Sequence, residues 1–78
     1  MSASYLVTAE VAAFLRCSVR TVHELTRRRA IPHRRMPGTR RCLFMERELH
    51  EWLDGAALET VELPDDGRIV RIVQLKGS

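Results

Sequence analysis

Four polar residues in the first half of the chain share one face of a predicted helix. They follow i, i+3, i+4 and i+7 spacing, and they are Arg20, His23, Glu24 and Arg27. Val22 and Leu25 would lie on the opposite side of the same helix and face a core. A surface helix with such a donor-rich face can enter the major groove of DNA and contact base edges and phosphates.

The helix that would carry this face is predicted over residues 18–29. Ser18 suits the N-cap position, because its hydroxyl can accept hydrogen bonds from the free N–H groups of the first turn. Pro32 disfavours helical geometry in the residue before it, so the helix is expected to end near Arg29 or Ala30.

Two residues of the polar face leave alternatives open. His23 could reach a base or a phosphate, or it could be a neutral surface histidine. Glu24 could accept from a cytosine amino group, but pairing with Arg20 or Arg27 along its own helix is the favoured interpretation.

A shorter helix is predicted just before, from Thr8 to about Arg16. Thr8 is expected to be its N-cap, with Glu10 in the first turn near the positive end of the helix dipole. The apolar face of this helix consists of Val11, Ala12 and Leu15, widened by Phe14. Two short helices joined by a tight turn, the second bearing the basic face, form a helix-turn-helix.

A β-hairpin that would lie beside the second helix as a wing is predicted next. Its expected strands are His33–Met36 and Arg40–Phe44, joined by the turn signal Pro37-Gly38-Thr39. Arg40 and Arg41 near the tip would meet an adjacent minor groove or the phosphate backbone.

A third helix is predicted over about Glu46–Asp54, ended by Gly55. Leu49, Trp52 and Leu53 follow i, i+3, i+4 spacing and would fill the core, with Trp52 supplying the largest apolar burial. Four carboxylates form no acid/base pair and are interpreted as the polar faces of this helix: Glu46, Glu48, Glu51 and Asp54.

The end of the chain predicts a second hairpin, with strands at Glu59–Leu63 and Arg68–Leu75 around the turn Pro64–Gly67. Its second strand is apolar on both faces, so it would either cover its own core or pair across a subunit edge. The predicted fold class is therefore mainly α with small β: a winged helix-turn-helix of three short helices over residues 1–55, and a C-terminal β-hairpin extension over residues 56–78 for interaction or oligomerisation.

The charge distribution supports a polyanionic partner for the first half of the chain. Residues 1–44 contain nine arginines and two glutamates, a net charge of +7, whereas four basic and eight acidic residues give residues 45–78 a net charge of −4. The planar fork of arginine matches phosphates and the paired acceptors of guanine, although a solvated charged surface is the alternative. The predicted DNA-contacting residues are Ser18, Arg20, Thr21, His23, Arg27, Arg28, Arg34, Arg40 and Arg41.

Other chemistry has little support in the sequence. Cys17 and Cys42 form no metal-ligand spacing, and His33 and His50 have no organised neighbours and are interpreted as structural. No catalytic constellation, phosphate loop, signal peptide or membrane span is apparent, so we expect a cytoplasmic protein that is no enzyme and uses no cofactor or metal.

Residues 5–54 as an ordered whole resemble the excisionase family of DNA-binding domains, which are winged helix-turn-helix domains of the MerR type. The resemblance rests on TAEVA at Thr8–Ala12, SVRTV at Ser18–Val22, the exit Ile31-Pro32, the wing with Gly38, Arg40 and Arg41, and ELHEWL at Glu48–Leu53. One position departs from the family, which usually has glycine where Arg29 stands. A residue other than glycine there would alter the helix exit or add a phosphate contact.

The resemblance implies a small accessory protein of a phage or integrative element. Such proteins bind attachment-site DNA, often as several copies side by side, bend it, and steer a tyrosine or serine integrase toward excision. By position, it implies recognition-helix contacts at Ser18, Arg20, Thr21 and Arg27 and wing contacts at Arg40 and Arg41.

The expected function is thus that of an excisionase, or recombination directionality factor. Its partners would be duplex DNA, an integrase and further copies of the chain, bound on DNA or through the C-terminal strand. A small MerR-type transcriptional regulator is the nearest alternative, and a protein-interaction module whose tail strand augments a partner sheet is another.

Overall fold

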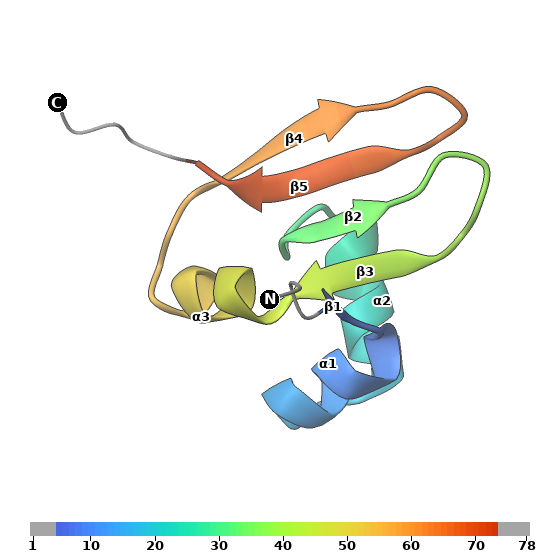
Figure 1. The fold of residues 1–78 in the computed structure, drawn as a ribbon. Coiled ribbons are helices and arrows are strands. Elements are labelled where there is room, and N and C mark those ends of the chain that lie inside the picture. Colours follow the sequence, from blue (N-terminus) through green and yellow to red (C-terminus); the bar gives the residue numbers. More distant parts are fainter. Residues whose placement is uncertain (1–4, 74–78) are drawn as a thin grey trace, which may run out of the picture.

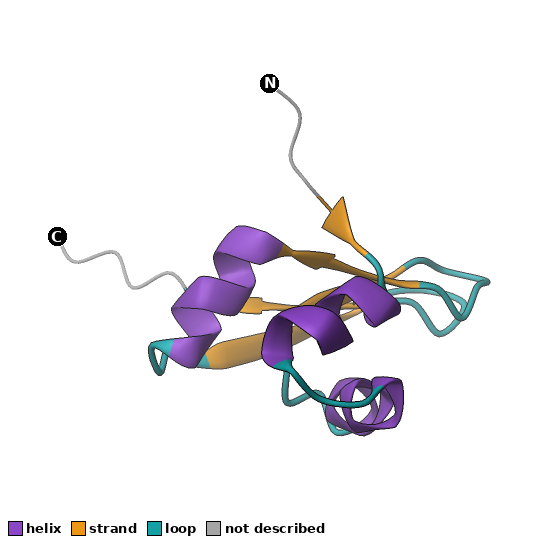
Figure 2. Cartoon of the chain, turned by 90° about the horizontal axis from the view of Figure 1, so that it is seen from below, coloured by secondary structure: helices purple, strands orange, loops and turns teal. Residues whose placement is uncertain are grey.

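The computed structural model describes residues 5–73, which form three helices and one five-stranded antiparallel sheet (Figure 1). In chain order the elements are β1 (Tyr5–Leu6), α1 (Thr8–Leu15), α2 (Val19–Arg27), β2 (His33–Arg35), β3 (Cys42–Met45), α3 (Glu46–Leu53), β4 (Leu58–Glu62) and β5 (Arg68–Ile72). The order of strands across the sheet is β1-β3-β2-β5-β4. In Figure 2 the sheet is seen nearly edge-on behind the helices. The sheet is larger than a mainly α description allows, so the fold is a mixed α and β one.

The helix-turn-helix consists of α1 and α2, as predicted. The N-cap of α1 is Val7, one residue earlier than expected, and the Val7 N–H donates to the Glu10 carboxylate at 2.9 Å. The prediction of Thr8 as the cap is wrong, because Thr8 is already the first residue of the helix and the Val7 carbonyl accepts from the Val11 N–H at 3.0 Å. Ser18 is confirmed as the N-cap of α2, since its Oγ accepts from the Thr21 N–H at 3.1 Å.

The exit of α2 has the geometry that usually requires glycine. The helix ends at Arg27, two residues before the predicted end, and Arg29 has a left-handed backbone with φ of 57°. The Arg29 N–H donates to the Thr26 carbonyl at 3.0 Å and the Ala30 N–H to the Leu25 carbonyl at 2.8 Å, which is the Schellman pattern. Arginine keeps the exit that glycine would make, at a backbone cost of about 1 kcal/mol.

Both predicted hairpins are present, and they belong to the same sheet. The wing hairpin pairs Arg34 with Leu43, but β3 begins at Cys42, so the expected strand start at Arg40 is wrong. Strand β5 pairs with β4 on one side and with β2 on the other, where His33 lies opposite Val70. The two neighbours of β5 therefore come from its own chain. Strand β5 ends at Ile72, so the predicted strand is too long at Val73, and its predicted residues 74–75 lie beyond the described residues.

The core is formed where α1, α2 and α3 meet β3. Its fully buried apolar side chains are Val11, Val22, Ile31, Phe44 and Leu49, and Ala12 is nearly buried. Trp52 is partly buried and packs against this cluster, whereas Leu53 is 57% exposed. The prediction that both fill the core is therefore wrong for Leu53, and Phe44 rather than Trp52 is the largest fully buried side chain.

Candidate nucleic-acid interface

The polar face of α2 points into solvent. Arg20, His23 and Arg27 are exposed, whereas Val22 and Thr26 on the other side of the helix are 0% and 7% exposed. The predicted orientation of this helix is confirmed. Its exposed hydroxyls lie at the start, where the Oγ atoms of Ser18 and Thr21 are 3.0 Å apart.

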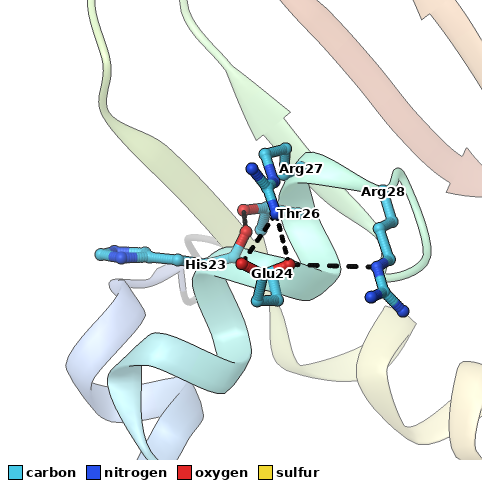
Figure 3. Close-up of polar contacts among 5 residues, drawn as sticks. All are labelled: His23, Glu24, Thr26, Arg27 and Arg28. Carbon is cyan, nitrogen blue, oxygen red and sulfur yellow. Dashed lines mark hydrogen bonds and ion pairs between the residues drawn. The ribbon is translucent and has the colours of Figure 1, made fainter.

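Glu24 forms ion pairs with Arg27 and Arg28 at the end of α2 (Figure 3). The Arg27 Nη2 donates to both carboxylate oxygens of Glu24, at 2.7 and 2.8 Å. The Arg28 Nε lies 3.9 Å from the same carboxylate. The favoured interpretation of Glu24 as an intrahelical partner is confirmed. Exposed pairs of this kind contribute at most about 1 kcal/mol, so a phosphate can displace the carboxylate.

Arg40 and Arg41 are exposed on the loop that joins β2 and β3. Thr39 fixes the shape of this loop, because its hydroxyl accepts from the Arg41 N–H at 3.2 Å and its carbonyl accepts from the Arg35 Nε at 3.2 Å. The arginines of the wing therefore project from an internally hydrogen-bonded turn.

The turn of the second hairpin supports the wing loop from the side. The Gly38 N–H donates to the Asp65 carbonyl at 3.0 Å. Gly67 packs so closely on Pro37 that an added Cβ would lie 2.9 Å from the proline Cγ. An open surface pocket between the two loops is lined by arginines and aspartates, among them Arg40 and Asp66. The second hairpin thus fixes the position of the wing.

Arg34 differs from the other predicted contacts. Its Nη1 and Nη2 donate to the two carboxylate oxygens of Glu48 at 2.8 and 3.2 Å, and only 27% and 10% of the two side chains are exposed. This bidentate pair joins β2 to α3. The interpretation of Glu48 as one of the residues on the polar faces of its helix is corrected, since Glu48 is buried in this pair. We therefore leave Arg34 out of the candidate interface.

Arg68 is the residue that sequence reasoning missed. It is 8% exposed, its Nε donates to the His33 Nε2 at 3.2 Å, and its Nη2 donates to the Thr26 carbonyl in the last turn of α2 at 3.0 Å. A guanidinium is favourable there because the C-terminal end of a helix carries partial negative charge. Arg68 therefore ties β5 to the end of the exposed basic helix.

Arg68 also bears on which ring nitrogen of His33 carries the proton and on the pKa of this histidine. The His33 Nδ1 lies 2.7 Å from the Ile31 carbonyl, so Nδ1 carries the proton and Nε2 is the acceptor for Arg68. Burial, together with the nearby guanidinium of Arg68, lowers the pKa of His33 below 6.5. Burial also lowers the pKa of Arg68. The sequence did hold one signal, since Arg68 alternates with Val70 and Ile72, which face the core.

Within residues 5–73, no group of three or more His, Cys, Asp or Glu side chains could hold a metal ion. In the same range no helix is long and apolar enough to cross a membrane. Cys17 and Cys42 are free and partly exposed, and burial raises the pKa of the Cys42 thiol.

A helix-turn-helix with an exposed basic second helix and an arginine-bearing wing defines a DNA-binding domain. A family model described as a helix-turn-helix domain matches residues 5–57, and the chain belongs to this family. No curated protein and no solved structure is significantly similar to the chain. The family match ends before β4, so the hairpin that contributes Arg68 lies outside it.

Proposed function

We propose that the protein is an excisionase, or recombination directionality factor, which binds and bends attachment-site DNA and steers an integrase toward excision. The observation that carries the proposal is the exposure of Arg20 and Arg27 on α2 together with that of Arg40 and Arg41 on the wing loop. The ordered resemblance of residues 5–54 to excisionases of the MerR type supports this choice among DNA-binding roles.

The proposed mechanism is architectural and includes no covalent chemistry. Helix α2 lies in the major groove, with Arg20 and Arg27 toward bases and phosphates, while Arg40 and Arg41 meet the adjacent minor groove. The energy of these contacts offsets the cost of bending the duplex, and the bent assembly favours one arrangement of the recombining sites. In this proposal the protein acts in the cytoplasm, on the DNA of its element.

A nuclease footprint across the DNA around the protein's own gene tests this function. We expect several adjacent protections in phase with the DNA helix, with enhanced cleavage between them where the duplex is bent. A single compact protection over a promoter would contradict the excisionase role and favour a MerR-type transcriptional regulator. The Arg20→Gln/Arg27→Gln variant is the control, because it lacks two arginines of α2 and should leave the DNA unprotected.

A further inference from the structure

A second exposed ion pair lies at the exit of α2, and its acid comes from the C-terminal hairpin. The Arg29 Nη2 is 3.4 Å from the Glu62 Oε2, and the two side chains are 43% and 65% exposed. Glu62 is the last residue of β4 and lies beyond the part of the chain that matches the helix-turn-helix family.

The fold itself brings these two residues together. The left-handed backbone of Arg29 turns the chain out of α2 and toward β2. Glu62 lies opposite Arg68 in the register of β4 and β5, and Arg68 is hydrogen-bonded to the Thr26 carbonyl at the end of α2. The end of β4 is thereby fixed beside the exit of α2.

A carboxylate and a DNA phosphate both accept hydrogen bonds from a guanidinium, so the Glu62 carboxylate competes with a phosphate for the Nη2 group of Arg29. Arg29 directly follows the exposed Arg28 and belongs to the arginine block at the end of α2. A phosphate that approaches this block meets the Glu62 carboxylate already beside Arg29.

We propose that Glu62 is an electrostatic brake on DNA binding, which occupies Arg29 in the free protein and must be displaced by a phosphate. The inference rests on DNA binding by the helix-turn-helix and does not need the excisionase role. Since the pair is exposed, removal of the carboxylate should tighten binding by about two- to fivefold at low salt. The brake weakens contacts to the DNA backbone, so it lowers affinity for every sequence and leaves base readout to α2.

The test compares Glu62→Gln with Glu59→Gln on the same strand. Glu59 also forms an exposed pair, with the Arg71 Nε at 2.7 Å, but it lies on the other face of β4 because side chains alternate along a strand. Both substitutions remove one negative charge. The probe is a fluorescent duplex of about 20 base pairs of arbitrary sequence, titrated by anisotropy in about 50 mM salt. Glu62→Gln should bind about two- to fivefold more tightly than wild type, and Glu59→Gln should bind like wild type.

A double-mutant cycle shows whether the effect passes through Arg29. In the Arg29→Gln background, Glu62→Gln should no longer change affinity. In the wild-type background it should steepen the dependence of log K on log salt by up to about 0.9, the value for one added phosphate contact. Equal affinities of Glu62→Gln and Glu59→Gln for DNA would overturn the proposed role of Glu62 but not DNA binding by the helix-turn-helix. The same would follow if Glu62→Gln tightened binding as much in the Arg29→Gln background as in wild type. No binding by any of these proteins would overturn this role together with DNA binding by the helix-turn-helix.

Discussion

Replacement of Arg68 by methionine should loosen the end of α2 and destabilise the whole domain. Methionine keeps an unbranched apolar side chain in the buried position but removes both donors. The Thr26 carbonyl would still accept from the Arg29 N–H, whereas the His33 Nε2 would lose its partner in a fully buried ring. Loss of hydrogen bonds from a charged donor, with a buried acceptor left unsatisfied, should lower the free energy of unfolding by about 2 kcal/mol.

The size of the domain makes this loss easy to measure. A chain of this length has a free energy of unfolding on the order of 5 kcal/mol, so a loss of about 2 kcal/mol should lower Tm by about 10 °C. The assays are urea unfolding for the free energy and thermal unfolding for Tm, both followed by circular dichroism. The matched control is Arg71→Met, three residues along the same strand, whose exposed pair with Glu59 is worth at most about 1 kcal/mol. If Arg68→Met costs no more than Arg71→Met, the tie between β5 and α2 does not hold the domain together.

Three further predictions concern other contacts around α2 and the wing. Because the pKa of His33 is lowered in the folded protein, the unfolded chain takes up a proton first as pH falls below 6.5. The free energy of unfolding should therefore fall as pH decreases below 6.5, by up to about 1.4 kcal/mol per pH unit. The control is His33→Gln, which keeps an acceptor for Arg68 but does not titrate, so its free energy of unfolding should fall less steeply. Equal pH slopes of the two proteins in urea unfolding would contradict this prediction. Arg29→Gly should relieve the left-handed backbone and raise stability by about 0.5–1 kcal/mol, yet weaken DNA binding; a less stable variant would argue against backbone strain there. Gly67→Ala should push Pro37 away, cost about 1 kcal/mol and weaken DNA binding measured by anisotropy; unchanged affinity would show that the wing needs no such support.

The helices and turns could be predicted because their signals are local. Ser18 as a cap, the apolar spacing of Val22 and Leu25, and the turn at Gly38 each depend on residues a few positions apart. The helix-turn-helix and the wing followed from these signals. Val7 rather than Thr8 is the cap of α1, although valine has no oxygen that could accept from the first turn, so residue type alone does not reveal this cap.

The contacts that set the candidate interface depend on long-range pairing, which the sequence did not indicate. Arg68 reaches Thr26 across 42 positions, and Arg34 reaches Glu48 across 14. In the sequence, Arg34 looks like every other arginine of the basic half. Arg68 alternates with the buried Val70 and Ile72, but its contact with His33 follows only from the pairing of β2 with β5. The exposed and the structural arginines can therefore be separated only once the sheet is known.

The most direct test of the central claim, that the exposed face of α2 binds DNA, compares Arg27→Gln with Arg71→Gln. Each arginine forms an exposed pair with a glutamate at 2.7 Å, so the two variants lose the same charge and the same kind of contact. Affinity for duplex DNA is measured by anisotropy across a range of salt concentrations. Arg27→Gln should bind more weakly than wild type, with a salt slope lower by about 0.9, and Arg71→Gln should bind like wild type. Equal effects of the two substitutions would contradict DNA binding by this face of α2.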